Sequence, residues 1–301
     1  MIDPNSIVIN PDGTERTLQQ IWGKPTGRVI APMSTKSIFF DGTANLAGQS
    51  DHVLIGDYDD FSFTDGAGND RPFSLSVWAF ITDVAASNGP FVTKAEIIGG
   101  AAGETEYIFK HANGELRTFL YTSLGTSDRI KLTSNATALT NATWHNIIFT
   151  YNGNKGAPSM KFYVDGIAVA STLGADGDYQ GMVNTTQPLL LGNTNNEPPA
   201  AGQAFEDQMA DVVIFNKELT STEVLEVFGG TAGVAGSGRV KDMNKFSDTS
   251  SIISWWQMGD GDTSATDGII DSIGSFNGTL ENGAKIINAK NLKSDYVTKV
   301  L

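Results

Sequence analysis

The stretch MADVVIFNKELTSTEV, residues 209–224, decides the fold class of this chain. Residues 212–215 form an unbroken apolar run, which is typical of a strand buried on both faces. Thr220 stands three residues before Glu223, and this capping-box spacing predicts that a short helix begins there. Gly229 follows the apolar positions of that helix and predicts its end. The sequence thus predicts a buried strand followed directly by a short capped helix.

Four segments upstream of this unit each predict a strand or a strand with its turn. In the three segments beyond residue 72, core-facing apolar residues recur with the period of two that a strand requires. Asn113-Gly114 and Asp165-Gly166 predict two-residue hairpin turns, because Asp, Asn and Gly tolerate the positive φ that both turn positions need. The four segments are SIFFDGTANLAG (37–48), FSLSVWAFIT (73–82), TWHNIIFTYNG (143–153) and SMKFYVDGIAVAS (159–171).

Taken in order, these five segments resemble a laminin-G-like domain of the concanavalin A-like class, over residues 37–230. The resemblance implies an all-β fold, a two-sheet antiparallel jelly-roll sandwich with one short helix. It also implies a scaffold that binds sugars and surfaces more often than it catalyses. Because a fold does not name a ligand, function needs separate evidence.

We expect four parts along the chain. Residues 1–36 form an N-terminal docking arm, with a strand at 7–9, a turn at 10–13 and a short helix at 14–22. The jelly roll spans 37–230, and the glycine-rich stretch within 231–245 predicts a flexible linker. Residues 246–301 form a C-terminal β module, which we expect to add strands to the same sandwich.

The composition of the 301 residues narrows the function. With a net charge of −14, the chain repels phosphates, which counts against nucleic acid and membranes and suits divalent cations or neutral glycans. The absence of cysteine excludes disulfides, thiolate metal sites and cysteine nucleophiles. The N-terminal residues lack the basic start and apolar core of a signal peptide.

A glycoside hydrolase is the enzymatic alternative, because the concanavalin A-like fold also hosts such enzymes. A retaining hydrolase needs two carboxyl groups about 5–5.5 Å apart. Glu104 and Glu106 have a suitable i, i+2 spacing, but they follow the glycine-rich stretch 99–103, which is typical of a mobile loop tip. No nucleophile elbow, P-loop or dinucleotide motif is present. We therefore expect a protein that is not an enzyme.

Calcium is the one cofactor that the sequence suggests, because Ca²⁺ takes oxygen ligands from loop carboxylates. Solvated turn carboxylates are the alternative explanation of both candidate clusters, and we give them more weight. The clusters are Asp57, Asp59 and Asp60 after one predicted strand, and Asp260, Asp262 and Asp271 in the C-terminal module.

Glycan binding would use exposed aromatic rings and amides at the loop end of the sandwich. An ordinary polar loop explains the same residues equally well. The candidates are Tyr58, Tyr179, Asn193, Asn195 and Asn196.

The leading functional hypothesis is a virion surface protein made in the host cytoplasm, whether a capsid decoration protein, a head fibre or a tail-associated protein. Three features agree with this hypothesis: the docking arm, the missing export signal and the surface-binding fold. In addition, the stretch WWQMGDGD…NGTLENGA (residues 255–284) resembles segments in structural proteins of phages of marine bacteria. Its partners would be other virion proteins through the arm, further copies of the chain in a homo-oligomer, and host surface glycans. A free bacterial lectin or adhesin and a glycoside hydrolase are the alternatives.

Overall fold

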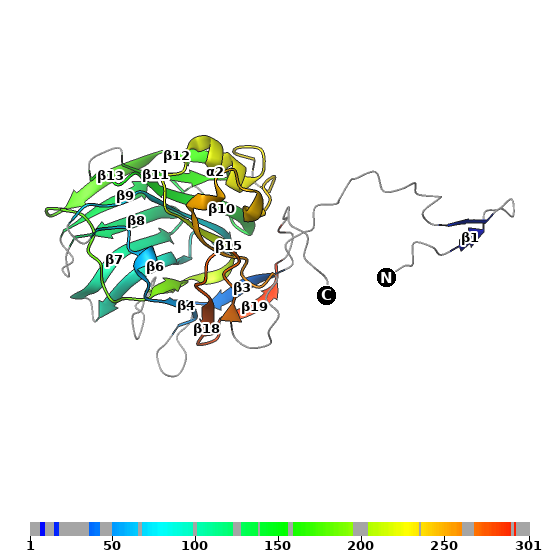
Figure 1. Ribbon diagram of the computed structural model, residues 1–301, viewed down its shortest axis with the longest axis horizontal. Coiled ribbons are helices and arrows are strands. Elements are labelled where there is room, and N and C mark those ends of the chain that lie inside the picture. Colours follow the sequence, from blue (N-terminus) through cyan, green and yellow to red (C-terminus); the bar gives the residue numbers. More distant parts are fainter. Residues whose placement is uncertain are drawn as a thin grey trace.

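A computed structural model of the chain describes residues 7–9, 15–17, 36–42, 50–65, 68–98, 101–122, 128–137, 139–155, 159–194, 204–234, 236–260, 268–289 and 292. Two antiparallel sheets form its body, and their strands are contributed from distant parts of the sequence (Figure 1). The predicted all-β jelly-roll sandwich is confirmed, with one α-helix in the described part of the chain.

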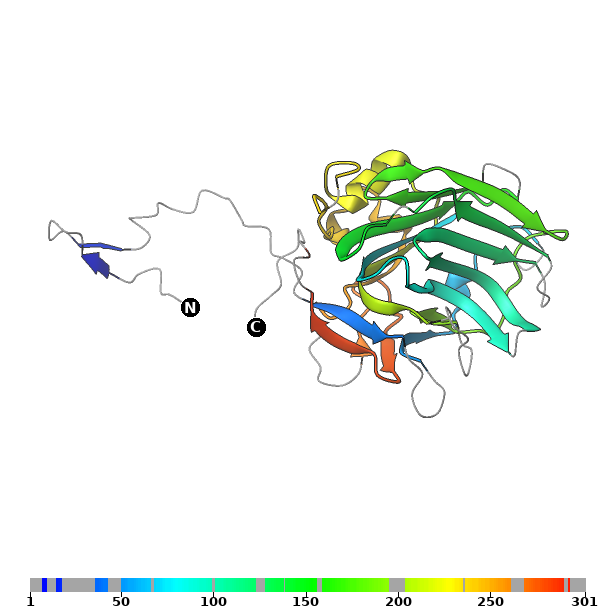
Figure 2. The same cartoon turned by 180° about the vertical axis from the view of Figure 1, so that it is seen from behind.

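The first sheet has nine strands and is called the nine-stranded sheet below. Figure 2 shows its central strands crossing the body from edge to edge. In spatial order its strands are β13 (Ser171–Asp176), β9 (Arg129–Ser134), β8 (Glu115–Tyr121), β7 (Ala101–Ala112), β6 (Asn88–Ile98), β14 (Leu189–Leu191), β4 (His52–Gly56), β18 (Gly278–Glu281) and β17 (Gly268–Ile269).

The second sheet has eight strands and is called the eight-stranded sheet. Its long central strand β15 (Glu206–Phe215) also pairs with β16 (Ile252–Trp256). In spatial order the other strands are β12 (Ile167–Val169), β11 (Met160–Val164), β10 (Thr143–Tyr151), β5 (Phe73–Ile81), β15 (Glu206–Phe215), β3 (Lys36–Asp41) and β19 (Lys285–Asn288).

The main hydrophobic core lies between the two sheets and follows the predicted alternation. On β5, Phe73, Leu75 and Val77 belong to this core, while Trp78 belongs to a second cluster on the other face of the sheet. The Phe63 ring stacks on Phe73 with 4.0 Å between the ring centroids. Such aromatic pairs add to the free energy gained by burying apolar area, so they stabilise the packing between the two sheets.

Helix α2 (Ser221–Phe228) covers part of the outer face of the eight-stranded sheet, beside β12 (Figure 1). Its predicted capping box is confirmed, because Thr220 Oγ1 accepts from the Glu223 amide and Glu223 Oε2 accepts from the Thr220 amide. Gly229 ends the helix with a φ of 64°, as predicted. The Phe228 ring stacks on Trp78 at 6.0 Å and fixes the helix to β5.

Residues 231–245, which we expected to be a flexible linker, pack against the sandwich in their described part. The Arg239 amide donates to the carbonyl of Phe228, and Val240 is fully buried. A Cβ at Gly238 would overlap the rings of Phe228 and Trp78, so only glycine permits this close approach. The short 3-10 helices η2 (Met243–Lys245) and η3 (Thr249–Ser251) continue over the same sheet.

The C-terminal segment adds strands to both sheets. β16 pairs with β15, β19 pairs with β3, and β18 pairs with β4 of the nine-stranded sheet. Asp211 sits at a bulge in β15 with a φ of 48°, and its buried carboxylate accepts a hydrogen bond from the Trp255 indole on β16. The bulge turns a polar side chain towards β16 and helps to join this segment to the body.

The predicted strand near the N-terminus is present as β1 (Ile7–Ile9), but the helix expected over residues 14–22 is wrong. Glu15–Thr17 form strand β2, which pairs antiparallel with β1. The turn-rich residues between the two strands favour a hairpin over a helix. In the described chain, no helix has the length and apolar character needed to cross a membrane.

Candidate functional site

In the first predicted calcium cluster, a lysine ammonium group lies beside the carboxylate of Asp57. Lys94 on β6 is fully buried, and its Nζ lies 2.8 Å from both Asp57 Oδ1 and Glu106 Oε1. It also donates to the Thr185 carbonyl at 3.1 Å. Oxygen ligands of this kind suit a metal ion, but here the ammonium group neutralises the carboxylates.

The remaining aspartates of this cluster take other partners or face solvent. Asp59 Oδ1 accepts from Asn184 Nδ2 at 3.0 Å, and Asp60 is exposed. The described residues contain no group of three His, Cys, Asp or Glu side chains that could hold a metal ion.

The second predicted calcium cluster is only partly described. The Asp271 carboxylate is buried and accepts from four backbone amides, including those of Trp255 at 3.0 Å and Gly274 at 2.9 Å. Asp260 is buried, and Asp262 lies outside the described residues. Asp271 therefore organises its own turn, since its oxygens are already used by amide donors.

The carboxyl pair considered for hydrolysis lies on strand β7 and not at a loop tip. Glu106 is fully buried, and its Oε1 accepts from Lys94, from the Thr185 amide and from Ser62. Burial raises the pKa of Glu106, and Lys94 partly offsets this. Glu104 accepts from Thr186, and these hydrogen bonds lower its pKa. Glu106 has no exposed atom with which to reach a glycosidic oxygen.

The residues predicted to bind glycan do not share one environment. Tyr58 is exposed, and its ring packs edge-on against Phe276 at 4.7 Å. Tyr179 was expected to be exposed but is buried, and its hydroxyl donates to Asp70 at 2.6 Å. Asn193 is also buried, and Asn195 and Asn196 lie outside the described residues.

A different site lies on the outer face of the nine-stranded sheet. On β7, β8 and β9, Tyr107, Leu116 and Ile130 point into the core, so the residues that alternate with them face outward. The outward set is called the cation–aromatic face and consists of Lys110, Arg117, Phe119, Tyr121, Arg129 and Lys131.

Two rings hold two cations on this face. The guanidinium carbon of Arg129 lies 5.1 Å from the Phe119 centroid and 5.8 Å from the Tyr121 centroid. The Lys131 ammonium lies 5.9 Å from the same Phe119 ring. Arg129 Nη1 also donates to the Tyr121 hydroxyl at 3.3 Å. These contacts position both cations above the sheet.

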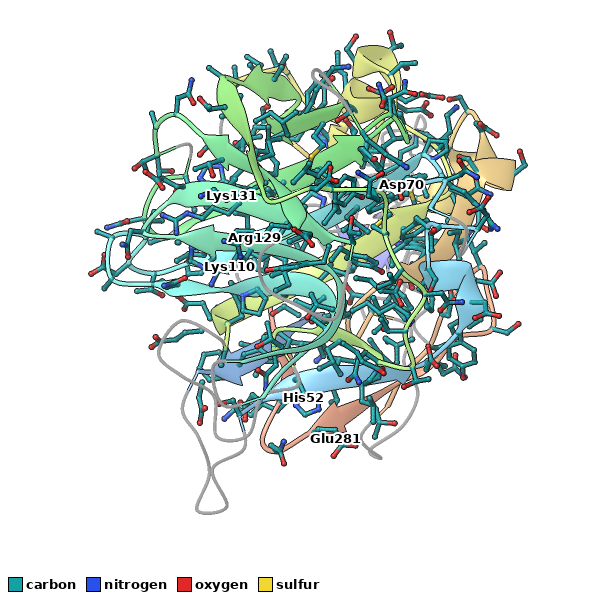
Figure 3. All side chains as sticks on the ribbon, turned by 90° about the vertical axis from the view of Figure 1, so that its left-hand side faces the viewer. His52, Asp70, Lys110, Arg129, Lys131 and Glu281 are labelled. Carbon is teal, nitrogen blue, oxygen red and sulfur yellow. The ribbon has the colours of Figure 1, made fainter. Side chains whose placement is uncertain are left out.

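Like charges meet at the other end of the face. Lys110 stands directly opposite Arg117 across the β7–β8 ladder. Burial, and secondly the Arg117 charge, lower the pKa of Lys110 to about 8. Arg117 also pairs with Glu115 at 2.8 Å. Figure 3 labels Lys110 on β7 and Arg129 and Lys131 on β9, and β8 lies between these two strands.

The sequence contains a signal for this face in the alternation along β9. In RIKLTS, residues 129–134, basic residues alternate with the core residues Ile130 and Leu132. The same alternation places Arg117 and Phe119 together on the next strand. Basic residues at every second position, in a chain of net charge −14, indicate a locally cationic sheet face.

A family model described as the concanavalin A-like lectin/glucanases superfamily matches residues 47–225, more than half of the chain. The chain belongs to this superfamily. The resemblance inferred from the five segments is thereby confirmed. No curated protein matches the chain at a significant level.

Solved structures resemble the chain at low sequence identity. A structure from Bacteroides ovatus, provisionally assigned as a carbohydrate binding protein, has a TM-score of 0.53 and 14% identity; the match covers 88% of this chain and 63% of that one. This chain therefore spans less than two thirds of that protein's length. A SAP-like pentraxin from Limulus polyphemus has a TM-score of 0.44 and 13% identity, over 65% and 82% of the chains. A sialidase CBM40 from Ruminococcus gnavus, bound to α2,3-sialyllactose, has a TM-score of 0.44 and 13% identity, over 65% and 99%.

The superfamily body also contains a cavity of about 460 Å³ where strands β12 and β13 form the edges of the two sheets. Its lining is mostly apolar, and its one charged side chain, Lys161, is paired with Glu218 at 2.8 Å. Saccharide hydroxyls require polar partners, so this cavity suits a sugar less well than the cation–aromatic face does.

Proposed function

We propose that the chain is a carbohydrate-binding protein and that the cation–aromatic face of its nine-stranded sheet is the binding surface. The observation that carries this proposal is the contrast between the outer faces of the two sheets. Helix α2 and residues 240–246 cover the eight-stranded sheet, whereas no described helix packs on Phe119 and its neighbours. Charged groups held over aromatic rings on a rigid sheet supply polar partners at fixed positions.

The comparison with known folds supports this proposal at the level of architecture. The Bacteroides ovatus protein, assigned provisionally to carbohydrate binding, has the same fold over most of this chain. Since its identity is 14%, the ligand of this chain has to be argued from its own residues.

We propose further that the protein is not an enzyme. The only carboxyl pair that the sequence suggested is Glu104 and Glu106, and Glu106 is fully buried with Oε1 held by Lys94. A general acid must come within hydrogen-bond distance of the bond it cleaves. We expect the native protein to hydrolyse no polysaccharide. Measurable hydrolysis that Glu106→Gln abolishes would contradict this proposal.

Binding to immobilised polysaccharides tests the proposed surface. We expect the native chain to bind at least one polysaccharide class and Phe119→Ala to weaken that binding by about tenfold. Phe39→Ala is the matched control, because Phe39 is a half-buried ring under Lys285 on the other sheet, with 5.2 Å between ammonium and centroid. No binding to any polysaccharide, or equal losses in both variants, would contradict the proposal.

We propose that this function is exercised on a virion surface, with residues 1–36 as the anchor to other virion proteins in a homo-oligomer. β1 and β2 pair only with each other among the described strands, and a single two-stranded hairpin is marginally stable by itself. Such a hairpin gains stability by docking on a partner. Mass spectrometry and electron microscopy of purified particles test this, and the chain's absence from every particle would favour a free lectin or adhesin.

A further inference from the structure

We infer that the saccharide recognised by the cation–aromatic face is anionic, bearing carboxylate or sulfate groups. This inference rests on the proposed function, because it names the ligand class of the same surface. It differs from the neutral glycan that the overall negative charge suggested. The reason for the difference is local and lies in how the four cations of the face are placed.

The aromatic rings of this face are covered by cationic side chains. A neutral sugar stacks its C–H surface on an open aromatic face, as in many binding sites rich in aromatic residues. Here the Arg129 guanidinium lies over both Phe119 and Tyr121, and the Lys131 ammonium lies over Phe119 as well. The contacts hold the two charges in position, so less conformational freedom is lost when an anion binds them.

The like charges of this face disfavour the free state. Lys110 and Arg117 stand opposite each other, and like charges directly across a ladder are destabilising; Glu115, 2.8 Å from Arg117, offsets part of this repulsion. Arg129 and Lys131 are two residues apart and share one side of β9. The lowered pKa of Lys110 reflects the burial and the neighbouring charge. An anion between these strands would offset the repulsion, and Arg129 or Arg117 could bind it through two parallel N–H donors.

The charge of the whole chain favours a saccharide over a nucleic acid. Duplex DNA carries about one negative charge per 1.7 Å of its axis, and this density is repelled by a body of net charge −14. A polysaccharide carries at most a few charges per residue and a flat polar surface between them. Screening limits long-range repulsion to about 8–10 Å at physiological salt, so a sparsely charged glycan can reach the local cations.

Two matched pairs of polymers test the inference by calorimetry or affinity electrophoresis. Dextran sulfate is compared with dextran, and polygalacturonate is compared with its methyl ester, so that only the charge differs within each pair. We expect the charged member of at least one pair to bind about tenfold more tightly or better, and to lose affinity as salt rises. The two pairs distinguish sulfate from carboxylate as the preferred group.

Variants locate the effect on the face. We expect the double variant Arg129→Gln/Lys131→Gln to weaken binding of the charged polymer by at least about tenfold. Lys285→Gln removes another lysine held over a phenylalanine, on the eight-stranded sheet, and we expect it to change nothing. Thermal unfolding of each variant shows whether it is folded.

The outcomes separate the inference from the proposed function. Equal binding to charged and neutral polymers, with loss in Phe119→Ala, would overturn the anionic class and leave carbohydrate binding intact. Binding to none of the four polymers would overturn both. If duplex DNA bound as tightly as the preferred polysaccharide, the inference would also be overturned, because the face would then bind any polyanion and would not recognise a saccharide.

Discussion

The guanidinium carbon of Arg129 lies 5.1 Å from the centroid of the Phe119 ring on the neighbouring strand. This pair joins the two properties on which the account depends, an aromatic surface and a fixed positive charge. It lies on the outer face of a sheet that no described helix covers.

The Arg129–Phe119 contact should be measurable in the free energy of unfolding. A double-mutant cycle with Arg129→Gln and Phe119→Leu removes the charge and the ring separately. We expect a coupling free energy of about 0.5–1 kcal/mol, the usual strength of a cation over a ring at a partly exposed site. Urea denaturation of the four proteins gives this value, and strictly additive losses would show that the contact contributes nothing.

Lys110 should make binding of an anionic polymer depend on pH. Its pKa is lowered to about 8; its partners across the two ladders are Pro90 on β6 and Arg117 on β8, and Arg117 is paired with Glu115. A bound anion favours protonated Lys110, so affinity should fall as the pH rises above about 8. Lys110→Arg keeps the charge at every such pH and should remove this part of the dependence. An identical pH profile in the variant would contradict the assignment.

The same group should affect stability with the opposite sign. Since the folded pKa of Lys110 lies below its unfolded value of 10.5, the unfolded chain binds more protons between about pH 8 and that value. The contribution of Lys110 to the free energy of unfolding should therefore increase as the pH rises through this window. Comparing native protein with Lys110→Arg by urea denaturation isolates it, and a constant difference between the two across the window would contradict this.

Lys94 should be essential to stability because it neutralises buried Glu106. Lys94→Met leaves that carboxyl without its cation, and we expect a loss of about 3–5 kcal/mol in the free energy of unfolding. Adding Glu106→Gln should recover part of the loss, since the buried charge is then gone. Lys161→Met is the control, because the Lys161–Glu218 pair is exposed and contributes at most about 1 kcal/mol. Similar losses in Lys94→Met and Lys161→Met would refute this role.

Calcium should have little effect on the thermal unfolding temperature. Asp57 is paired with the Lys94 ammonium, and the Asp271 carboxylate accepts from backbone amides. These groups are already neutralised or hydrogen-bonded, so they offer few free oxygens to a cation. A clear drop in unfolding temperature on adding EDTA, reversed by calcium, would show that a metal site exists all the same.

The fold could be predicted from the sequence because its signals are local. Asn113-Gly114 and Asp165-Gly166 adopt the positive φ values that their turns require, 52° and 82° for the first and 50° and 79° for the second. The Thr220–Glu223 capping box depends on residues three positions apart. Alternation along β5 depends on neighbours in the chain, so its core side was readable without any knowledge of the other sheet.

The candidate site could not be predicted in the same way, since it depends on which strands lie side by side. Lys110 meets Arg117, and Phe119 meets Lys131, only through the pairing of β7, β8 and β9. Tyr179 was misjudged for a similar reason, because its partner Asp70 is 109 residues away in the chain. The loop tip expected over residues 99–103 is wrong for residues 101–103, which belong to β7, because a glycine-rich stretch does not exclude a strand when a neighbouring strand pairs with it; residues 99 and 100 lie outside the described residues.

The most direct test of the central claim is an NMR titration of the labelled protein with an oligogalacturonate or a sulfated oligosaccharide. We expect the largest chemical-shift changes to fall on β7, β8 and β9, with the side-chain signals of Arg129 and Lys110 among them. Changes concentrated instead around Tyr58, or around the cavity beside β12 and β13, would place the binding site elsewhere and contradict the account.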